Sequence, residues 1–117
     1  MGRQLAFWKY EEGVYLDNKE VYKKSCGDGE EVPGLSELPG DEILNKIKRE
    51  FKDYERLDEY NYGGELGSFT VYINSQSVVF DCSFRVPEGE LNKMIDIMDS
   101  FGCPLYDPQI ETRFDGH

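Results

Sequence analysis

Apolar residues alternate with polar ones along two neighbouring segments in the middle of the chain. The segments are SFTVYIN, residues 68–74, and VVFDCSF, residues 78–84. A period of two is typical of strands with one buried face, and the SQS turn between the segments predicts an antiparallel hairpin. The positions assigned to the buried face are Phe69, Val71 and Ile73 in the first segment and Val78, Phe80, Cys82 and Phe84 in the second.

Two other segments have apolar residues three and four positions apart, which is typical of amphipathic helices. The first helix is predicted to begin near Asp41, and the second to begin at Pro87 and end before Gly102. Proline suits a first helical turn, and glycine accepts the left-handed cap that ends a helix. The apolar positions are Ile43, Leu44, Ile47 and Phe51 in the first helix and Leu91, Met94, Ile95 and Met98 in the second, with Phe101 close to that stripe.

The N-terminal part of the chain predicts a strand over LAFWKY, residues 5–10, and a short return strand over VYL, residues 14–16. In the first strand, Trp8 and Tyr10 share one side, and Leu5 and Phe7 share the other. Asp17 and Glu20 have the spacing of a capping box, so a short helix is expected over residues 18–25. Residues 26–40 are predicted to be irregular, with Val32, Leu35 and Leu38 fixing them to the body.

Two further strands are predicted. RLDEYNY, residues 56–62, has strand character and is followed by a glycine-rich turn over residues 63–67. LYD, residues 105–107, stands between Pro104 and Pro108. Because proline is tolerated only at the edge or end of a strand, this strand should be short and lie at an edge or end there.

The order of these elements predicts an α+β fold in a single domain, residues 1–117. It is the order of a ferredoxin-like, two-layer sandwich: an antiparallel sheet with two main helices on one face and a small hairpin and helix inserted near the N-terminus. The other face would carry Trp8, Tyr10, Tyr72 and Tyr60 or Tyr62. Either the insert covers this aromatic face, or the face receives a protein or a small molecule.

The charge of the chain narrows the choice of partner. Among 117 residues, 24 are acidic and 13 are basic, which gives a net charge of -11. Such a field repels nucleic acids and anionic lipids and attracts basic surfaces. The same charge also serves solubility alone, which is the alternative reading. No stretch approaches the roughly 18 apolar residues of a membrane span, so we expect a cytoplasmic protein without membrane association.

The residues that usually carry chemistry are scarce. Cys26, Cys82 and Cys103 form no C-x-x-C pair, and the one histidine, His117, is the final residue and has the position of a tag remnant. The odd number of cysteines argues against a disulfide framework, and Cys82 lies in an apolar row, where a buried and unreactive thiol is expected. We therefore expect no catalytic residues, no metal, no cofactor and no enzyme activity.

The segment LYDPQ, residues 105–109, follows an amphipathic helix. This ending resembles small uncharacterised bacterial α+β domains, some of which are similar to toxin-immunity proteins. The resemblance implies a bacterial, cytoplasmic protein that binds another protein, and it identifies no catalytic residue. From the residues alone, an alternative is that Asp107 caps a turn before Pro108 and that Gln109 bonds the local backbone.

The sequence therefore predicts an acidic protein-binding module, as a monomer or homodimer, in the manner of an immunity-type inhibitor of a basic toxin or enzyme. It would present carboxylates to a cationic site and use an aromatic side chain as anchor. The alternative function is a small-molecule-binding regulatory domain. The candidate partner-binding residues are Trp8, Tyr10, Tyr72, Asp96, Asp99, Tyr106 and Asp107.

Overall fold

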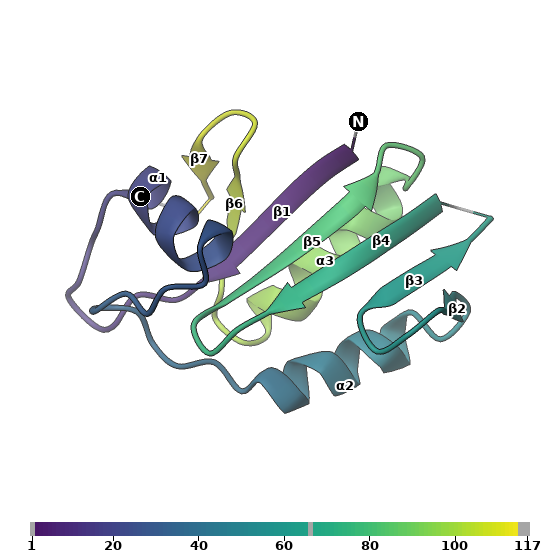
Figure 1. Ribbon diagram of the computed structural model, residues 1–117, viewed down its shortest axis with the longest axis horizontal. Helices are drawn as coiled ribbons and strands as arrows, with labels where there is room; N and C mark the ends of the chain where they lie inside the picture. Colours follow the sequence, from purple (N-terminus) through teal and green to yellow (C-terminus); the bar gives the residue numbers. More distant parts are fainter. Residues whose placement is uncertain (1, 66, 115–117) are drawn as a thin grey trace.

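An interior strand of the sheet, β1 (Gly2–Trp8), pairs with β5 (Ser77–Ser83) on one side and with β6 (Leu105–Asp107) on the other (Figure 1). The computed structural model describes residues 2–65 and 67–114. Within these residues the sheet has seven strands in the order β2-β3-β4-β5-β1-β6-β7, and all neighbours are antiparallel. The remaining strands are β2 (Glu55–Arg56), β3 (Asn61–Gly64), β4 (Gly67–Ile73) and β7 (Thr112–Arg113).

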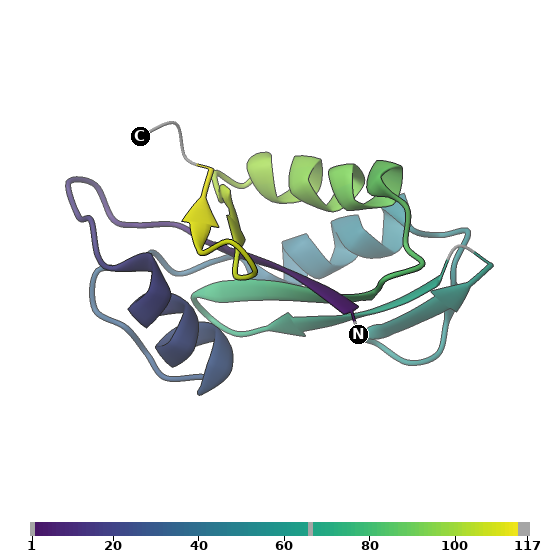
Figure 2. The ribbon, with the colours of Figure 1, turned by 90° about the horizontal axis from the view of Figure 1, so that it is seen from above.

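Helical segments lie on both faces of the sheet. Figure 2 shows α2 (Gly40–Glu50) and α3 (Glu88–Asp99) side by side on one face. On the other face, α1 (Asn18–Val21) continues into a π-helical turn, η1 (Tyr22–Gly27). Both belong to the segment between β1 and α2, residues 9–39, which we call the insert. The α+β character that the sequence predicts is confirmed, and the insert adds a helical segment outside the layer of α2 and α3.

The main core fills the space between the sheet and the helices α2 and α3. It takes most of the residues that the two hydrophobic periods assign to it, but Ile97 is buried in α3 while Ile95, predicted in the stripe, is only partly buried. The pairing of Val71 with Phe80 aligns the apolar rows of β4 and β5. The buried members from the sheet and helices include Leu5, Phe7, Phe69, Val71, Val78, Phe80, Cys82, Ile43, Ile47, Phe51, Leu91, Met94, Ile97 and Met98.

A second apolar cluster lies on the opposite face of the sheet, under the insert. Ala6 and Trp8 of β1 reach it because their side chains alternate with those of Leu5 and Phe7, and all four have no exposed surface. The cluster comprises Ala6, Trp8, Val21, Val32, Leu35, Val79 and Tyr106. The aromatic side of the predicted first strand is therefore covered, which is one of the two alternatives left open by the sequence.

Several local predictions are confirmed. The β4–β5 hairpin is present, and α2 and α3 begin and end within a few residues of the expected positions. Gly102 has a φ of 78°, the left-handed conformation expected after the end of α3. Asp17 caps α1, because its carboxylate accepts a hydrogen bond from the Lys19 N–H at 3.0 Å.

The predicted return strand at residues 14–16 is wrong. Instead, Tyr10 forms an isolated antiparallel bridge with Leu35, and the Glu11 N–H donates to the carbonyl of Gly34 at 2.8 Å. The backbone that follows β1 thus pairs with the end of the insert, more than twenty residues away in sequence. Such a long-range pairing leaves no period in the local sequence.

Two further expectations about strands need correction. Phe84 was assigned to the buried row, but it is 78% exposed, because the Val86 N–H bonds to the Ser83 carbonyl and this turn ends β5. The predicted strand over residues 56–62 is divided into β2 and β3. Between them the Asp58 carboxylate accepts the N–H groups of Tyr60 and Asn61, which closes a turn.

The C-terminal strand β6 is short, as expected, and ends at Asp107 immediately before Pro108. It is not the edge strand, since β7 pairs with it on the outer side. The Asp107 carboxylate accepts the Gln109 N–H at 2.9 Å, so the predicted turn cap is confirmed. His117, which we considered a tag remnant, lies outside the described residues.

A buried glutamine fastens the insert to the β4–β5 turn. The Gln76 side chain accepts the Val32 N–H at 2.8 Å and donates to the carbonyls of Val32 at 3.0 Å and Leu35 at 3.3 Å. Gln76 therefore satisfies backbone groups that the irregular path of the insert leaves without partners. A buried backbone group without a partner costs about 1–3 kcal/mol.

We predict that Gln76→Ala lowers the free energy of unfolding by about 2–3 kcal/mol, because it leaves the Val32 N–H and the Leu35 carbonyl unpaired. The matched control is Gln109→Ala at an exposed position, which should change stability by less than about 0.5 kcal/mol. Urea denaturation followed by circular dichroism measures both. Equal stabilities of the two variants would contradict the role given to Gln76.

Candidate functional site

Three of the residues that the sequence offers for partner binding are buried. Trp8 has no exposed surface, and Tyr106 and Asp107 expose 1% and 4%. Trp8 and Tyr106 pack on each other in the second cluster, with ring centroids 5.1 Å apart. Asp107 pairs with Arg3 at 3.2 Å in addition to capping its turn. Their roles in the fold are structural, and none of the three presents a surface to a partner.

The other four candidates do not form one surface. Tyr10 is half-buried in the insert, where its hydroxyl donates a hydrogen bond to Asn18 Oδ1. The Arg113 guanidinium carbon lies 4.7 Å from the centroid of the Tyr10 ring. Tyr72 of β4 is 56% exposed on the sheet face opposite α2 and α3. Asp96 and Asp99 are exposed on α3. A single partner could not contact Tyr72 and the outer surface of α3 together without wrapping around the sheet.

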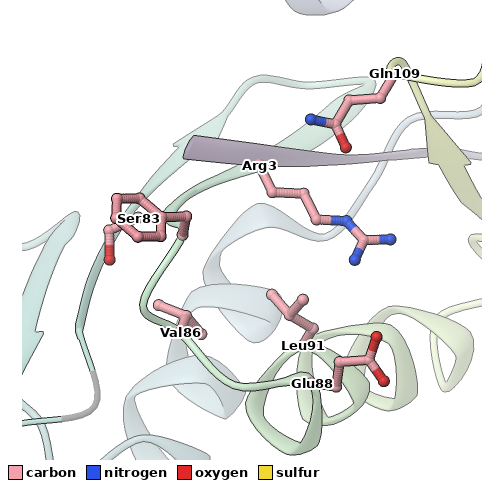
Figure 3. A pocket seen from close by; sticks show the side chains of 7 residues that line it. Arg3, Ser83, Val86, Glu88, Leu91 and Gln109 are labelled. Carbon is pink, nitrogen blue, oxygen red and sulfur yellow. The ribbon is translucent and has the colours of Figure 1, made fainter. Parts of the chain in front are cut away.

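Three hollows among the described residues have similar volumes: one of about 570 Å³ lies beside residues 31–37 of the insert, and the other two compete as functional sites. The first of these two, of about 550 Å³, lies where β1 meets the beginning of α3 (Figure 3). Figure 3 shows the Arg3 side chain extending from β1 toward the first turn of α3, where Glu88 and Leu91 lie. The Arg3 guanidinium is already bonded to Asp107, and Glu88 adds a second carboxylate nearby, so this hollow offers little positive charge for an anion.

The second hollow has a more definite character, and we call it the acidic groove. It has a volume of about 600 Å³ and lies between the end of α2, the β2–β3 hairpin and the first turns of α3. Its lining includes five carboxylates and one ammonium group. The residues are Glu50, Phe51, Asp53, Tyr54, Glu55, Gly63, Gly64, Glu65, Glu90 and Lys93.

The local structure explains why these groups meet. Phe51 is the C-cap of α2 and turns its ring into the core, where it packs on Phe69 at a centroid distance of 5.0 Å. Tyr54 lies one turn later and packs edge-on against Phe51, at 5.5 Å. Gly64 of β3 has no side chain on this side of the hairpin, where a Cβ would lie 3.8 Å from the Tyr54 ring. The groove therefore has an aromatic floor and acidic walls.

Tyr54 and Glu90 connect the floor to the wall. The Tyr54 hydroxyl donates to Glu90 Oε1 at 3.0 Å. Burial, together with this hydrogen bond and the charge of Glu90, raises the pKa of Tyr54 well above its usual range. The hydroxyl thus remains protonated at neutral pH and holds the Glu90 carboxylate in a fixed orientation.

Lys93 is the one cation in the lining of the groove. Its Nζ lies 3.4 Å from Glu90 Oε2 and 5.4 Å from the centroid of the Phe51 ring. This is the geometry of an ion pair combined with a cation–π contact. The other four carboxylates of the groove form no ion pair with a lysine or arginine in the described part of the chain. The groove therefore has a strong local excess of negative charge.

The negative charge of this lining suits a cation. Glu90 is held by the Tyr54 hydroxyl, the Tyr54 ring is half-buried and Phe51 is only 1% exposed. The lining contains no cysteine, serine or histidine. Among the residues described, no group of three or more acidic, cysteine or histidine side chains is arranged to hold a metal ion. None of the described helices has the length and apolar character needed to cross a membrane.

The comparisons with known proteins give no further guidance: no family model, no curated protein and no solved structure matches the chain. The site is therefore defined by its geometry alone. No local sequence pattern reveals the groove, because its walls come from residues 50–55, 63–65 and 90–93, which are separated along the chain. The signal available in the sequence was the run FKDYE, residues 51–55, which places two aromatic residues close to two acidic ones.

The three cysteines have no part in the groove. All are free thiols; Cys82 and Cys103 are buried and Cys26 is half-buried. Burial raises the pKa of Cys82 to about 12 and those of Cys26 and Cys103 to about 11. The expected shielding of Cys82 agrees with this environment, in which its sulfur lies 3.6 Å from that of Met94.

We predict that a thiol-reactive reagent at pH 8 labels Cys26 before the other two cysteines and labels Cys82 only when the protein unfolds. Only the thiolate reacts, and all three raised pKa values keep the thiolate fraction small at this pH. Mass-spectrometric mapping of the labelled peptides under native and denaturing conditions measures the order. Rapid native labelling of Cys82 would contradict the register of β5.

Proposed function

We propose that the chain is an acidic protein-binding module that docks a basic segment of another protein in the acidic groove. The observation that carries this proposal is the set of five carboxylates around the floor formed by Phe51 and Tyr54. A cationic side chain entering this groove gains both charge pairing and contact with aromatic rings. In this proposal the aromatic anchor is formed by Phe51 and Tyr54, and not by the tyrosines and Trp8 that the sequence places on the sheet face.

The overall charge supports the same function. A net charge of -11 steers a basic partner toward the molecule before contact, and the groove then supplies the short-range interactions. Asp96 and Asp99, exposed on α3, contribute to this long-range field. We assign them to steering and the groove residues to retention of the partner.

We also propose that the fold is ferredoxin-like. The order β4-β5-β1-β6 within the sheet supports this, because α2 lies between β1 and β4 along the chain and α3 connects β5 to β6. On this reading, β2, β3, β7 and the insert are additions to a βαββαβ core. An immunity-type inhibitor, as the resemblance of the LYDPQ segment implies, is the form of binding module that we favour.

The hollow beside Arg3 is the observation that favours the second candidate, a small-molecule-binding regulatory domain. Its volume of about 550 Å³ lies within the range of small-molecule sites, and Val86 and Leu91 provide apolar walls. The charge pairing of Arg3 with Asp107 reduces its capacity to orient a ligand. We therefore place this function after docking of a basic protein.

The experiment compares two double variants that remove the same charge from different places. The groove pair is Glu50→Gln with Asp53→Asn, and the helix pair is Asp96→Asn with Asp99→Asn. The probe is an immobilised peptide of six arginines separated by glycines, and surface-plasmon resonance gives the association and dissociation rates. Glu50 ends α2, where a negative charge opposes the helix dipole, so its neutralisation preserves folding.

We predict that both double variants associate with the peptide more slowly than the unmodified protein does. For the unmodified protein and both variants, the association rate should decrease as the salt concentration rises. The reason is that the Debye length falls from about 10 Å at 0.1 M to about 3 Å at 1 M. Only the groove pair should increase the dissociation rate, by about five- to tenfold, because it removes short-range contacts. Equal dissociation rates of the two pairs would contradict docking in the groove.

A further inference from the structure

The position of Lys93 indicates how the acidic groove is occupied in the absence of a partner. Its ammonium group lies between Glu90 Oε2 and the Phe51 ring, at 3.4 Å and 5.4 Å. The other oxygen of Glu90 is taken by the Tyr54 hydroxyl. The best-defined cation position in the groove is therefore filled by a side chain of the same protein.

We propose that Lys93 is an internal competitor and that an arginine side chain of a protein partner displaces it from Glu90 and Phe51. This inference rests on the docking function proposed above and specifies the partner's chemistry at the groove. The exchange replaces one cation by another over the same carboxylate and ring. No bond is formed or broken.

The exposure of the two partners makes the exchange feasible. The Lys93 side chain is 45% exposed, whereas that of Glu90 is 13% exposed. Lys93 and Glu90 are three residues apart on α3, and such pairs contribute only about 0.2–0.5 kcal/mol to a helix. Lys93 can thus swing into solvent at small cost, while Glu90 stays in place on the Tyr54 hydroxyl.

The shape of the groove favours arginine over lysine as the incoming side chain. A guanidinium is planar, stacks on aromatic rings and binds carboxylates through two parallel N–H groups. Phe51 and Tyr54 supply the rings, and Glu50, Asp53 and Glu55 supply carboxylates beyond the one that Lys93 engages. The volume of about 600 Å³ exceeds the need of a single ammonium group.

Charge also decides between the possible occupants. A second copy of this chain would bring another net charge of -11, and no excess of basic side chains, to an acidic surface. A basic segment of a different protein complements the groove. The occupant is therefore an arginine-bearing segment of another protein.

The test uses Lys93→Met, which keeps an unbranched apolar stem over Phe51 and removes the ammonium group. Its matched control is Lys52→Met, because Lys52 is exposed, neighbours Phe51 in sequence and does not line the groove. Both variants change the net charge equally. The probe is a blocked Gly-Arg-Gly-Arg-Gly peptide, with a citrulline version as the neutral control, and isothermal titration gives the dissociation constants.

We expect Lys93→Met to bind the arginine peptide about tenfold more tightly than the unmodified protein, which corresponds to about 1.4 kcal/mol. Lys52→Met should change the affinity by less than about twofold, because it alters only the long-range field. An equal increase in affinity in the two variants would overturn the displacement of Lys93, but it would not contradict docking of the peptide in the groove. Failure of every variant to prefer arginine over citrulline would overturn the docking function as well.

A second measurement needs no substitution. In the unmodified protein, the ring current of Phe51 should shift the Lys93 side-chain methylene signals in the nuclear magnetic resonance spectrum upfield. Saturation with the arginine peptide should return these signals to the values of a solvent-exposed lysine. Upfield signals that persist at saturation would show that Lys93 is not displaced.

Discussion

The side chains of β1 alternate between two closed environments, Leu5 and Phe7 under α2 and α3, and Ala6 and Trp8 under the insert. A strand buried on both faces requires cover on both, and the chain supplies it from different regions. The C-terminal segment completes the cover, since Tyr106 packs on Trp8 and the Arg113 guanidinium donates to the Trp8 carbonyl at 2.8 Å. Tyr106 and Arg113, near the end of the chain, thus help to cover β1.

The acidic groove, which we propose as the functional surface, lies at the far end of the sheet from β6 and β7. The strands β2 and β3 are short, and only α2 and α3 flank them on the core side. Phe51 and Tyr54 close the core there, so their rings form both its boundary and the floor of the acidic groove. Because the rings are fixed by packing, the groove offers a preorganised site to a cation. Phe51 and Tyr54 therefore both close the core and form the floor of the proposed binding site.

Sequence patterns predicted those parts of the fold that depend on local periodicity. The β4–β5 hairpin, α2, α3 and the Gly102 cap follow from residues within a few positions of one another. Phe84 was misplaced because the alternation of apolar residues continues past the turn that ends β5. The sequence left open whether the aromatic face that carries Trp8 is covered, because its cover comes from residues 21–35, far away in sequence. The groove was missed for the same reason, as three separate segments build it.

The central claim is that the acidic groove, rather than the acidic surface as a whole, recognises a cationic side chain. The most direct measurement is a titration of ¹⁵N-labelled protein with N-acetyl-arginine amide, followed residue by residue through amide chemical shifts. The account predicts that the largest changes fall on Phe51, Tyr54, Gly63, Gly64 and Glu90, with small changes at Asp96 and Asp99. Shifts of similar size spread over all acidic residues would contradict it.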